Sequence, residues 1–293
     1  MSFTGTYTAL ITPFRDGTVD REAFRALIDA QVDAGIDGIV PVGTTGESPT
    51  LDHHEHIEVI QLAVEAAAGR VQVVAGSGAN STREAISLTR AAEHAGATGS
   101  LQVCPYYNKP SQEGLYQHFR AVAEATTLPI MLYSIPGRSV IEIAIDTVAR
   151  LAADCPNIVS VKEAGGSVDR VNQLVQALPE DFSILSGDDP LTLPFMACGA
   201  VGLVSVAANI IPDVMARLVR ACLNQSFDEA LAIQKQYYPL LHGLMTLDTN
   251  PVPIKAAVAL QGRCAEEYRL PLAPMSASTK ESLQELLHDF DLL

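Results

Sequence analysis

The sequence predicts a (β/α)8 barrel, and three observations support this prediction. Short, continuously apolar runs alternate with amphipathic stretches about eight times along the 293 residues. Apolar strands separated by single helices are typical of parallel strands that are covered on both faces. Eight such units also fit the usual size of this barrel, roughly 250 residues. The alternative is a doubly wound sheet, but no glycine-rich fingerprint follows the first apolar run to support it.

The same patterns predict the individual elements in chain order. Strands are expected at residues 7–11, 38–42, 71–75, 100–104, 130–133, 158–162, 183–185 and 201–204. Helices are expected at residues 20–34, 53–68, 81–94, 111–126, 145–153, 168–178, 191–197 and 211–223. Cap chemistry at Ser81 and Ser111 indicates helix starts. Glycines 35, 96 and 199 indicate helix ends.

The strand pattern stops near residue 224. Helical patterns follow at residues 226–246, 251–260 and 276–291, and together they are too small to bury a core of their own. We therefore expect a barrel domain at residues 1–224 and a C-terminal helical extension at residues 225–293 that packs on it. No linker composition marks a second independent domain.

Composition and charge argue against several classes of function. A net charge of −15 leaves no basic surface for nucleic acid. No apolar run approaches the ~20 residues of a membrane helix, and the first residues lack a secretion signal. Five cysteines, an odd number without close pairs, indicate reduced thiols rather than disulfides. We therefore expect a cytoplasmic protein that contacts neither nucleic acid nor membrane.

Lys162 is the candidate nucleophile. It ends the β-branched run 158–162, whereas no other lysine ends such a run (Lys109, Lys235, Lys255 and Lys280). Burial disfavours the charged ammonium, and the neutral amine is the form that attacks a carbonyl to give a Schiff base. A strand-end lysine can instead extend to solvent or pair with a carboxylate, so this pattern alone leaves both interpretations open.

Polar, glycine-rich motifs follow several expected strands, and a barrel brings such motifs to its C-terminal face. The segment 43–48, Gly-Thr-Thr-Gly-Glu-Ser, offers hydroxyls at Thr44 and Thr45 and backbone N–H groups that can hold a carboxylate. Its hydroxyls could instead cap the start of the helix expected at residues 53–68.

Two further strand-end residues carry suitable chemistry. Tyr133 lies two positions after Met131 and shares its inward face, where a phenol can relay protons or simply pack in the core. Arg138 follows Pro-Gly in an expected loop. Its guanidinium suits bidentate capture of a carboxylate, although a solvated loop arginine would show the same pattern.

A histidine cluster at residues 53–56 raises the question of a metal. His53 and His56 are one turn apart on a helix face, so they could meet one ion. The His-x3-His spacing and a third ligand are missing from the sequence. We therefore expect no metal here, and interpret the histidines as surface residues or an effector contact.

These motifs together resemble the pyruvate-dependent class I aldolase family, which includes the dihydrodipicolinate synthases and N-acetylneuraminate lyase. The resemblance covers nearly the whole chain. Gly-Thr-Thr-Gly-Glu at residues 43–47 and Lys-Glu-Ala at residues 162–164 are shared widely in the family. Pro-Tyr-Tyr-Asn-Lys-Pro at residues 105–110 and Pro-Gly-Arg at residues 136–138 are more selective for the dihydrodipicolinate synthase branch.

The resemblance implies a (β/α)8 barrel with a C-terminal helical extension, assembled as a dimer of dimers. It also implies condensation of pyruvate with aspartate semialdehyde, without a metal or organic cofactor. In this reading Lys162 forms the imine with pyruvate. Three hydroxyl groups form the proton relay, the last from the neighbouring subunit: Tyr133, Thr44 and Tyr107. The substrates are held by Thr45, the backbone of Val204, and Arg138 for the semialdehyde carboxylate.

The resemblance further implies an effector site for L-lysine at a dimer interface. Its members would be Ser48, His53, His56, Asn80, Glu84 and Tyr106. The set suits an amino acid, because a carboxylate can pair with its ammonium group and a phenol can reach its carboxylate. The alternative is a polar dimer rim with no ligand.

Two other functions remain open at this stage. A sugar-acid lyase, of the N-acetylneuraminate or keto-deoxy-gluconate type, accepts aldehydes without a distal carboxylate, and Arg138 weighs against it. A non-catalytic sensor of pyruvate or an amino acid could use the same fold. The intact set of Lys162, Tyr133 and Thr44 disfavours that sensor.

Overall fold

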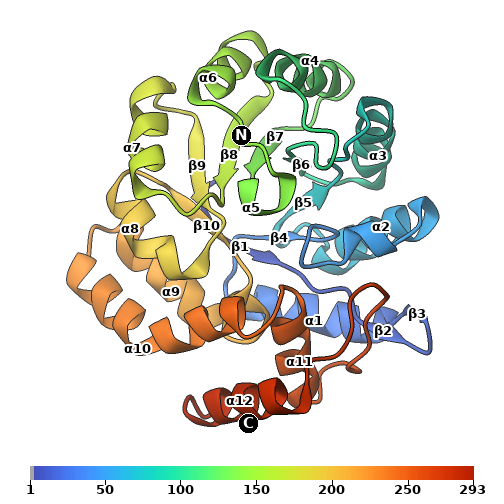
Figure 1. Cartoon of the computed structure of the whole chain (residues 1–293), viewed down its shortest axis with the longest axis vertical. Coiled ribbons are helices and arrows are strands. Elements are labelled where there is room, and N and C mark those ends of the chain that lie inside the picture. Colours follow the sequence, from blue (N-terminus) through green and yellow to red (C-terminus); the bar gives the residue numbers. More distant parts are fainter. Residues whose placement is uncertain (1–2) are drawn as a thin grey trace.

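The computed structural model describes residues 3–293, which build a closed barrel of parallel strands (Figure 1). The barrel strands are β1 Gly5–Ala9, β4 Gly38–Val40, β5 Gln72–Gly76, β6 Gly99–Val103, β7 Ile130–Ser134, β8 Ile158–Glu163, β9 Ser183–Ser186 and β10 Gly202–Ser205. Each pairs with its neighbour in the chain, and β10 closes on β1. The predicted (β/α)8 barrel is therefore confirmed.

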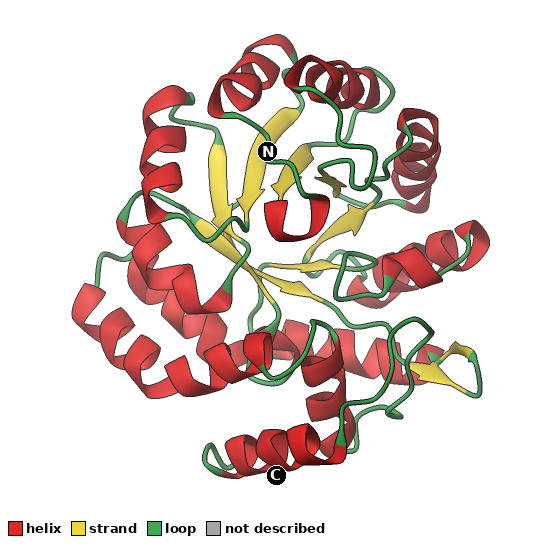
Figure 2. Cartoon of the chain, viewed as in Figure 1, coloured by secondary structure: helices red, strands yellow, loops and turns green. Residues whose placement is uncertain are grey.

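Helices surround the strands (Figure 2). Those between barrel strands, or after the last one, are α1 Arg21–Asp33, α2 His53–Ala67, α3 Thr82–Ala95, α4 Gln112–Ala123, α6 Ile145–Asp154, α7 Val168–Ala177, α8 Thr192–Ala197 and α9 Pro212–Leu223. Three C-terminal helices follow: α10 Phe227–Thr246, α11 Val252–Leu260 and α12 Ala277–His288. Short 3-10 helices are η1 Ser48–Thr50, η2 Asp189–Leu191 and η3 Ala207–Asn209. None of the helices within residues 3–293 is long and apolar enough to cross a membrane.

Some local expectations were wrong. The first strand runs from Gly5 to Ala9, two residues earlier than predicted, because Leu10 and Ile11 are buried in the loop that follows. A hairpin of β2 Phe14–Arg15 and β3 Thr18–Val19 was not predicted, since its strands are too short to show periodicity. Its turn is Asp-Gly with positive φ at both residues, as a type I′ turn requires.

Arg138 is not in a loop, because it belongs to the four-residue helix α5 Pro136–Ser139. The proline at the first helical position fixes a suitable φ. The glycine that follows has a low helix propensity, so the sequence does not predict a helix here. The hydroxyl of Ser139 lies 2.9 and 2.8 Å from the carbonyl oxygens of Ile135 and Ile141 and donates its one proton to either of them. This short helix therefore presents the arginine from a braced turn.

The expected helix caps are partly confirmed. The Ser111 side chain caps α4, whereas Ser81 makes no side-chain cap bond to α3. Helix α2 begins with a capping box formed by Asp52 and Glu55, so the hydroxyls of segment 43–48 do not cap it. The glycines 35, 96 and 199 have φ of +78°, +90° and +109° at helix ends, as predicted.

Lys255, in α11, is a second buried lysine, which the sequence analysis did not predict. It is completely buried and pairs with Glu47 of the Gly-Thr-Thr-Gly-Glu segment, with Nζ 2.5 Å from Oε1. Its Nζ lies 4.0 Å from the ring centroid of Phe14 and 5.5 Å from that of Tyr268. Burial lowers the pKa of Lys255, and the Glu47 carboxylate opposes this. The C-terminal helices are thus joined to a barrel loop by a buried ion pair.

Breaking this pair by Lys255→Met should destabilise the protein by about 3–5 kcal/mol, because the buried Glu47 carboxylate then lacks its cationic partner. Urea unfolding at pH 7 measures the loss. The double variant Glu47→Gln with Lys255→Met should recover part of it, since no buried charge remains. Lys235→Met, at an exposed position of α10, is the control. Equal stability of the two single variants would contradict the assignment.

Candidate active site

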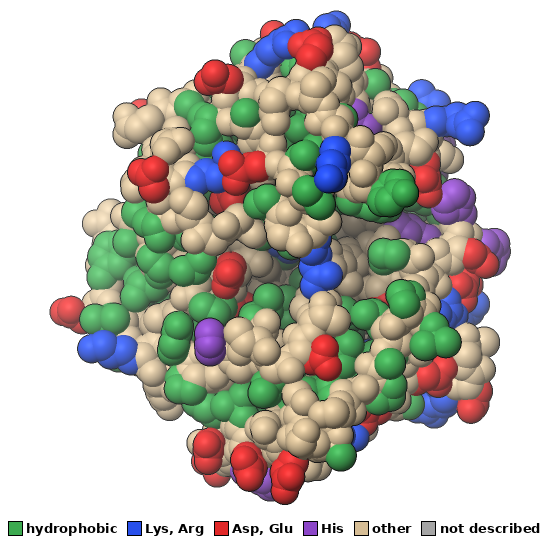
Figure 3. All heavy atoms as spheres, in the orientation of Figure 1, with side chains coloured by type: hydrophobic (Ala, Val, Ile, Leu, Met, Phe, Trp, Pro, Cys, Tyr) green, Lys and Arg blue, Asp and Glu red, His purple; other side chains and the backbone are tan. Residues whose placement is uncertain are grey.

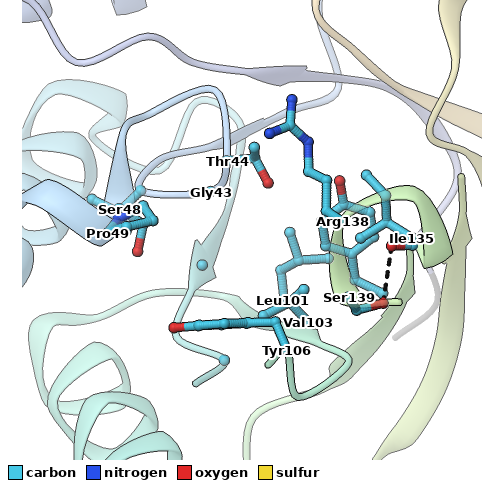
Figure 4. A pocket seen from close by; sticks show the side chains of 14 residues that line it. Gly43, Thr44, Ser48, Pro49, Leu101, Val103, Tyr106, Ile135, Arg138 and Ser139 are labelled. Carbon is cyan, nitrogen blue, oxygen red and sulfur yellow. Dashed lines mark hydrogen bonds between the residues drawn. The ribbon is translucent and has the colours of Figure 1, made fainter. Parts of the chain in front are cut away.

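The face at the carboxyl ends of the barrel strands is hollowed near its centre (Figure 3). The hollow is a cavity of about 240 Å³. Residues that follow β4, β5, β6 and β7 line it, together with the inward face of the strands (Figure 4). Its polar and charged side chains include Thr44, Ser48, Tyr106, Tyr133, Arg138 and Ser139. The sequence predicted that its candidate motifs lie at this end of the barrel, and Thr44, Tyr133 and Arg138 from those motifs line the cavity.

Lys162 and Tyr133 meet inside the barrel. They are direct partners in the register of β7 and β8, and the lysine Nζ lies 4.2 Å from the centroid of the tyrosine ring. Lys162 is 6% exposed, yet its amine has no hydrogen-bond or ion-pair partner anywhere in residues 3–293. Space for its side chain depends on Gly187, where a Cβ would lie 2.7 Å from the lysine Cε. The amine of Lys255, by contrast, forms an ion pair with the carboxylate of Glu47.

The segment that contains Thr44 and Thr45 forms a tight turn after β4. Two glycines let it pack closely, because a Cβ at Gly46 or Gly76 would lie 2.9 or 2.5 Å from backbone atoms of Val42. Val42 itself has φ of +51°, which is costly for a β-branched residue. The N–H groups of Thr44 and Thr45 have no acceptor in the described part of the chain. Free N–H donors beside hydroxyls suit an anionic ligand.

Arg138 lines the same cavity from α5 (Figure 4). Its Nη2 donates to the backbone carbonyl of Asn250 at 2.8 Å. The side-chain amide of Asn250 donates to Oγ1 of Thr45 at 3.1 Å, and both of these groups are buried. Sequence reasoning missed Asn250, because nothing in the pattern before α11 indicates that it reaches two barrel loops.

Acidic residues that the sequence analysis left without a role surround Lys162. Asp188 follows Gly187, and burial together with Asp189 raises its pKa to about 6, while His242 and Lys162 oppose the rise. Asp189 is buried and accepts hydrogen bonds from the Ser205 hydroxyl and from the N–H groups of residues 206 and 207. It therefore anchors the turn after β10.

Glu163 points away from the barrel interior, since neighbouring residues of a strand face opposite sides. It is buried and accepts from Nε of Arg170 at 2.8 Å and from the N–H of Gly165 at 2.8 Å. Burial raises the pKa of Glu163, and the Arg170 guanidinium opposes this. The pair holds the carboxyl end of β8 in place next to Lys162.

Four expected catalytic or substrate-binding residues are not part of the cavity lining: Lys162, Thr45, Val204 and Tyr107. Lys162 and Thr45 are buried next to lining residues, Tyr133 and Thr44. Val204 is fully buried in β10, where it packs inside the barrel with Tyr7 and Leu185. Tyr107 is 88% exposed, in the loop between β6 and α4, with φ of +73°. Within one chain, therefore, only Thr44 and Tyr133 of the expected proton relay face the same cavity.

The residues expected to bind an effector fall into two groups. Ser48 and Tyr106 line the cavity, and the Tyr106 carbonyl accepts from the side chain of Asn80 at 3.2 Å. His53, on an exposed surface, pairs with Glu84 at 2.7 Å. His56 differs from it sharply. Its ring is buried and hydrogen-bonds the carbonyl of Gly76 at 2.8 Å, and burial lowers its pKa.

The described residues contain no group of three His, Cys, Asp or Glu side chains arranged to hold a metal ion. His53 and His56, one turn apart on α2, have different partners and do not face a common ligand site. One contacts Glu84 at the surface and the other contacts a backbone carbonyl inside.

A closed parallel barrel with a polar cavity at its C-terminal face defines a (β/α)8-barrel enzyme. The dihydrodipicolinate synthetase family matches residues 2–290. The chain therefore belongs to the dihydrodipicolinate synthetase family.

Individual relatives agree over the full length. The chain is 49% identical to 4-hydroxy-tetrahydrodipicolinate synthase of Persephonella marina, over 99% of both chains. The structure of 4-hydroxy-tetrahydrodipicolinate synthase from Methylacidiphilum fumariolicum SolV is 54% identical, with a TM-score of 0.98, over 99% of this chain and 96% of that one. The structure of DHDPS from Cyanidioschyzon merolae with lysine bound is 40% identical, with a TM-score of 0.96, over 99% of each chain.

Proposed function

We propose that this enzyme condenses pyruvate with L-aspartate 4-semialdehyde to give 4-hydroxy-tetrahydrodipicolinate, a step toward diaminopimelate and lysine. The names of its full-length relatives support the reaction. The observation that carries the mechanism is the amine of the largely buried Lys162 side chain, which has no partner among the described residues and lies against the Tyr133 ring. An amine that is not engaged in an ion pair or hydrogen bond is available to attack a ketone.

The chemistry starts with attack of the Lys162 amine on the pyruvate ketone, which loses water and leaves an imine. Loss of a proton from the methyl group gives an enamine, whose carbon attacks the aldehyde of the second substrate. The amino group of that substrate then attacks the imine carbon and displaces the lysine, closing the ring. Tyr133 and Thr44 face the cavity where these protons move, which supports their role in the relay.

Two anion-binding groups suit the two substrates. The hydroxyl of Thr45 and the free N–H groups of Thr44 and Thr45 would hold the carboxylate of pyruvate. The guanidinium of Arg138 would hold the carboxylate of the semialdehyde. A sugar-acid lyase has no use for this second cationic group, and a sensor has no use for an unpartnered buried amine. Both alternatives are therefore less well supported.

The first test concerns the nucleophile. Incubation with pyruvate followed by borohydride reduction should add the mass of one reduced pyruvate to each chain, at Lys162. The variant Lys162→Ala should lose this adduct and keep its fold, whereas Lys235→Ala at an exposed position should keep both. Peptide mapping that finds the adduct on Lys255 instead would overturn the mechanism.

The second prediction concerns the semialdehyde. A hydrogen bond to a charged group contributes about 1.5–3 kcal/mol, and Arg138 is exposed in this structure, so Arg138→Ala should reduce kcat/KM for the semialdehyde by roughly 10-fold or more. Imine trapping with pyruvate alone should be largely unchanged. Arg217→Ala, at an exposed position of α9, controls for loss of a surface charge. Normal kinetics in Arg138→Ala would exclude this role.

The third prediction concerns assembly. We propose a homotetramer, a dimer of dimers, in which Tyr107 of one chain completes the relay of another. An 88% exposed tyrosine with φ of +73° is an unusual surface feature for an isolated chain and suits an interface. Mixing Tyr107→Phe chains with Lys162→Ala chains should then restore activity. Some sites of the mixed oligomer combine the intact Lys162 of one chain with the intact Tyr107 of the other. Activity no higher than that of the separate variants would show that each chain is self-contained.

The fourth prediction concerns regulation. We propose that L-lysine inhibits the enzyme by binding near Ser48, Asn80, Glu84 and Tyr106, and the lysine-bound DHDPS relative supports this. The ligand ammonium would take the Glu84 carboxylate from His53, while the buried His56 would support the wall without contacting the ligand. Glu84→Gln should weaken inhibition about tenfold, in initial-rate assays and calorimetry, and Glu281→Gln on exposed α12 should not. Full activity of the wild type at millimolar lysine would exclude regulation.

A further inference from the structure

Asn250 connects the C-terminal helices to Thr45 and Arg138, the two groups proposed above to bind the substrate carboxylates. It precedes α11 and is 8% exposed. Its side-chain amide donates to Oγ1 of Thr45, 205 residues away in the chain. Its backbone carbonyl accepts from Nη2 of Arg138, 112 residues away. One residue outside the barrel strands therefore contacts the groups assigned to each substrate carboxylate.

We propose that Asn250 is a positioning residue, which turns the Thr45 hydroxyl proton toward pyruvate and holds the Arg138 guanidinium for the semialdehyde. The proposal rests on the function argued above. Its physical basis is that a hydroxyl group can donate one hydrogen bond through its proton and can accept two through its lone pairs. When the amide of Asn250 donates to Oγ1, the threonine proton stays free for a carboxylate.

The orientation of the amide matters for this argument. If its oxygen faced Thr45, the threonine would donate its proton to Asn250 and present lone pairs to an anionic substrate. In the observed orientation Oδ1 of Asn250 is buried without a partner among the described residues. That orphaned acceptor is a cost of the donor contact to Thr45.

The contact to Arg138 works in a similar way. A guanidinium carries five N–H donors in a rigid plane, and the carbonyl of Asn250 uses one of them at 2.8 Å. The remaining donors stay available for a carboxylate. Because one residue makes both contacts, it also sets the spacing between the two anion-binding groups.

Asn250 is itself held in place by α11. The helix begins two residues later, and its Lys255 is locked to Glu47, which lies two residues beyond Thr45. The turn that contains Thr45 is thus held by the C-terminal helices at two points. This geometry gives Asn250 little freedom to move away from Thr45.

The test compares Asn250→Asp and Asn250→Ala with the wild type. The aspartate variant replaces the donor by an acceptor of similar shape, so the Thr45 proton is drawn away and a negative charge faces pyruvate. The pyruvate concentration for half-maximal borohydride trapping should rise at least tenfold, and the pyruvate KM with it. The alanine variant should show a smaller rise. The semialdehyde KM should change less than in Arg138→Ala, because the backbone carbonyl remains.

Two controls separate positioning from general damage. Asn224→Asp makes the same charge change at an exposed position after α9, and it should leave both KM values unchanged. In a Thr45→Val background, Asn250→Ala should cause no further loss of pyruvate trapping, since the group it orients is gone. A full additional loss there would overturn the proposal, as would trapping in Asn250→Asp within twofold of wild type. Absence of trapping in the wild type would instead overturn the proposed function.

Discussion

Closure of the barrel determines how the carboxyl ends of its strands, and so the residues of the cavity, lie relative to one another. Strand β1 pairs with both β4 and β10, so that every barrel strand has two neighbours and the carboxyl ends gather around one cavity. The pairing of β10 with β1 needs glycine at position 202, because a Cβ there would lie 2.4 Å from the carbonyl oxygen of Gly5. Register then propagates around the sheet and makes Tyr133 the direct neighbour of Lys162. The site is therefore a product of strand pairing before any loop is considered.

Around this frame, buried charges hold the chain segments that line the cavity. Arg170 binds Glu163 behind β8, Lys255 binds Glu47 in the turn after β4, and Asp189 receives three hydrogen bonds from the end of β10. Each group would be expensive to bury alone, and each has its partners in place. Lys162 differs from them, since its side chain is 6% exposed and its amine has no hydrogen-bond or ion-pair partner within residues 3–293. The contrast separates the charges that hold the cavity walls in place from the group proposed to react there.

The sequence predicted the features that depend on local periodicity. The run that ends at Lys162 matches β8 to within one residue, because a strand buried on both faces is continuously apolar. The inward direction of Tyr133 followed from alternation along β7. What could not be predicted depends on contacts between distant segments. Nothing near Lys255 reveals Glu47, and nothing near Asn250 reveals Thr45, because those partners lie 208 and 205 residues away.

Asn250 and Lys255 both hold the turn after β4, through Thr45 and Glu47. These two contacts limit the insertions and deletions that the chain can accept. Surface connections usually accept insertions and deletions at little cost. The stretch between α10 and α11 is a connection of that kind by appearance, yet Asn250 within it must reach Thr45 while Lys255 reaches Glu47. One residue more or less between Asn250 and Lys255 would move one contact out of register with the other. The spacing of these two residues is therefore under the same constraint as the length of a catalytic loop.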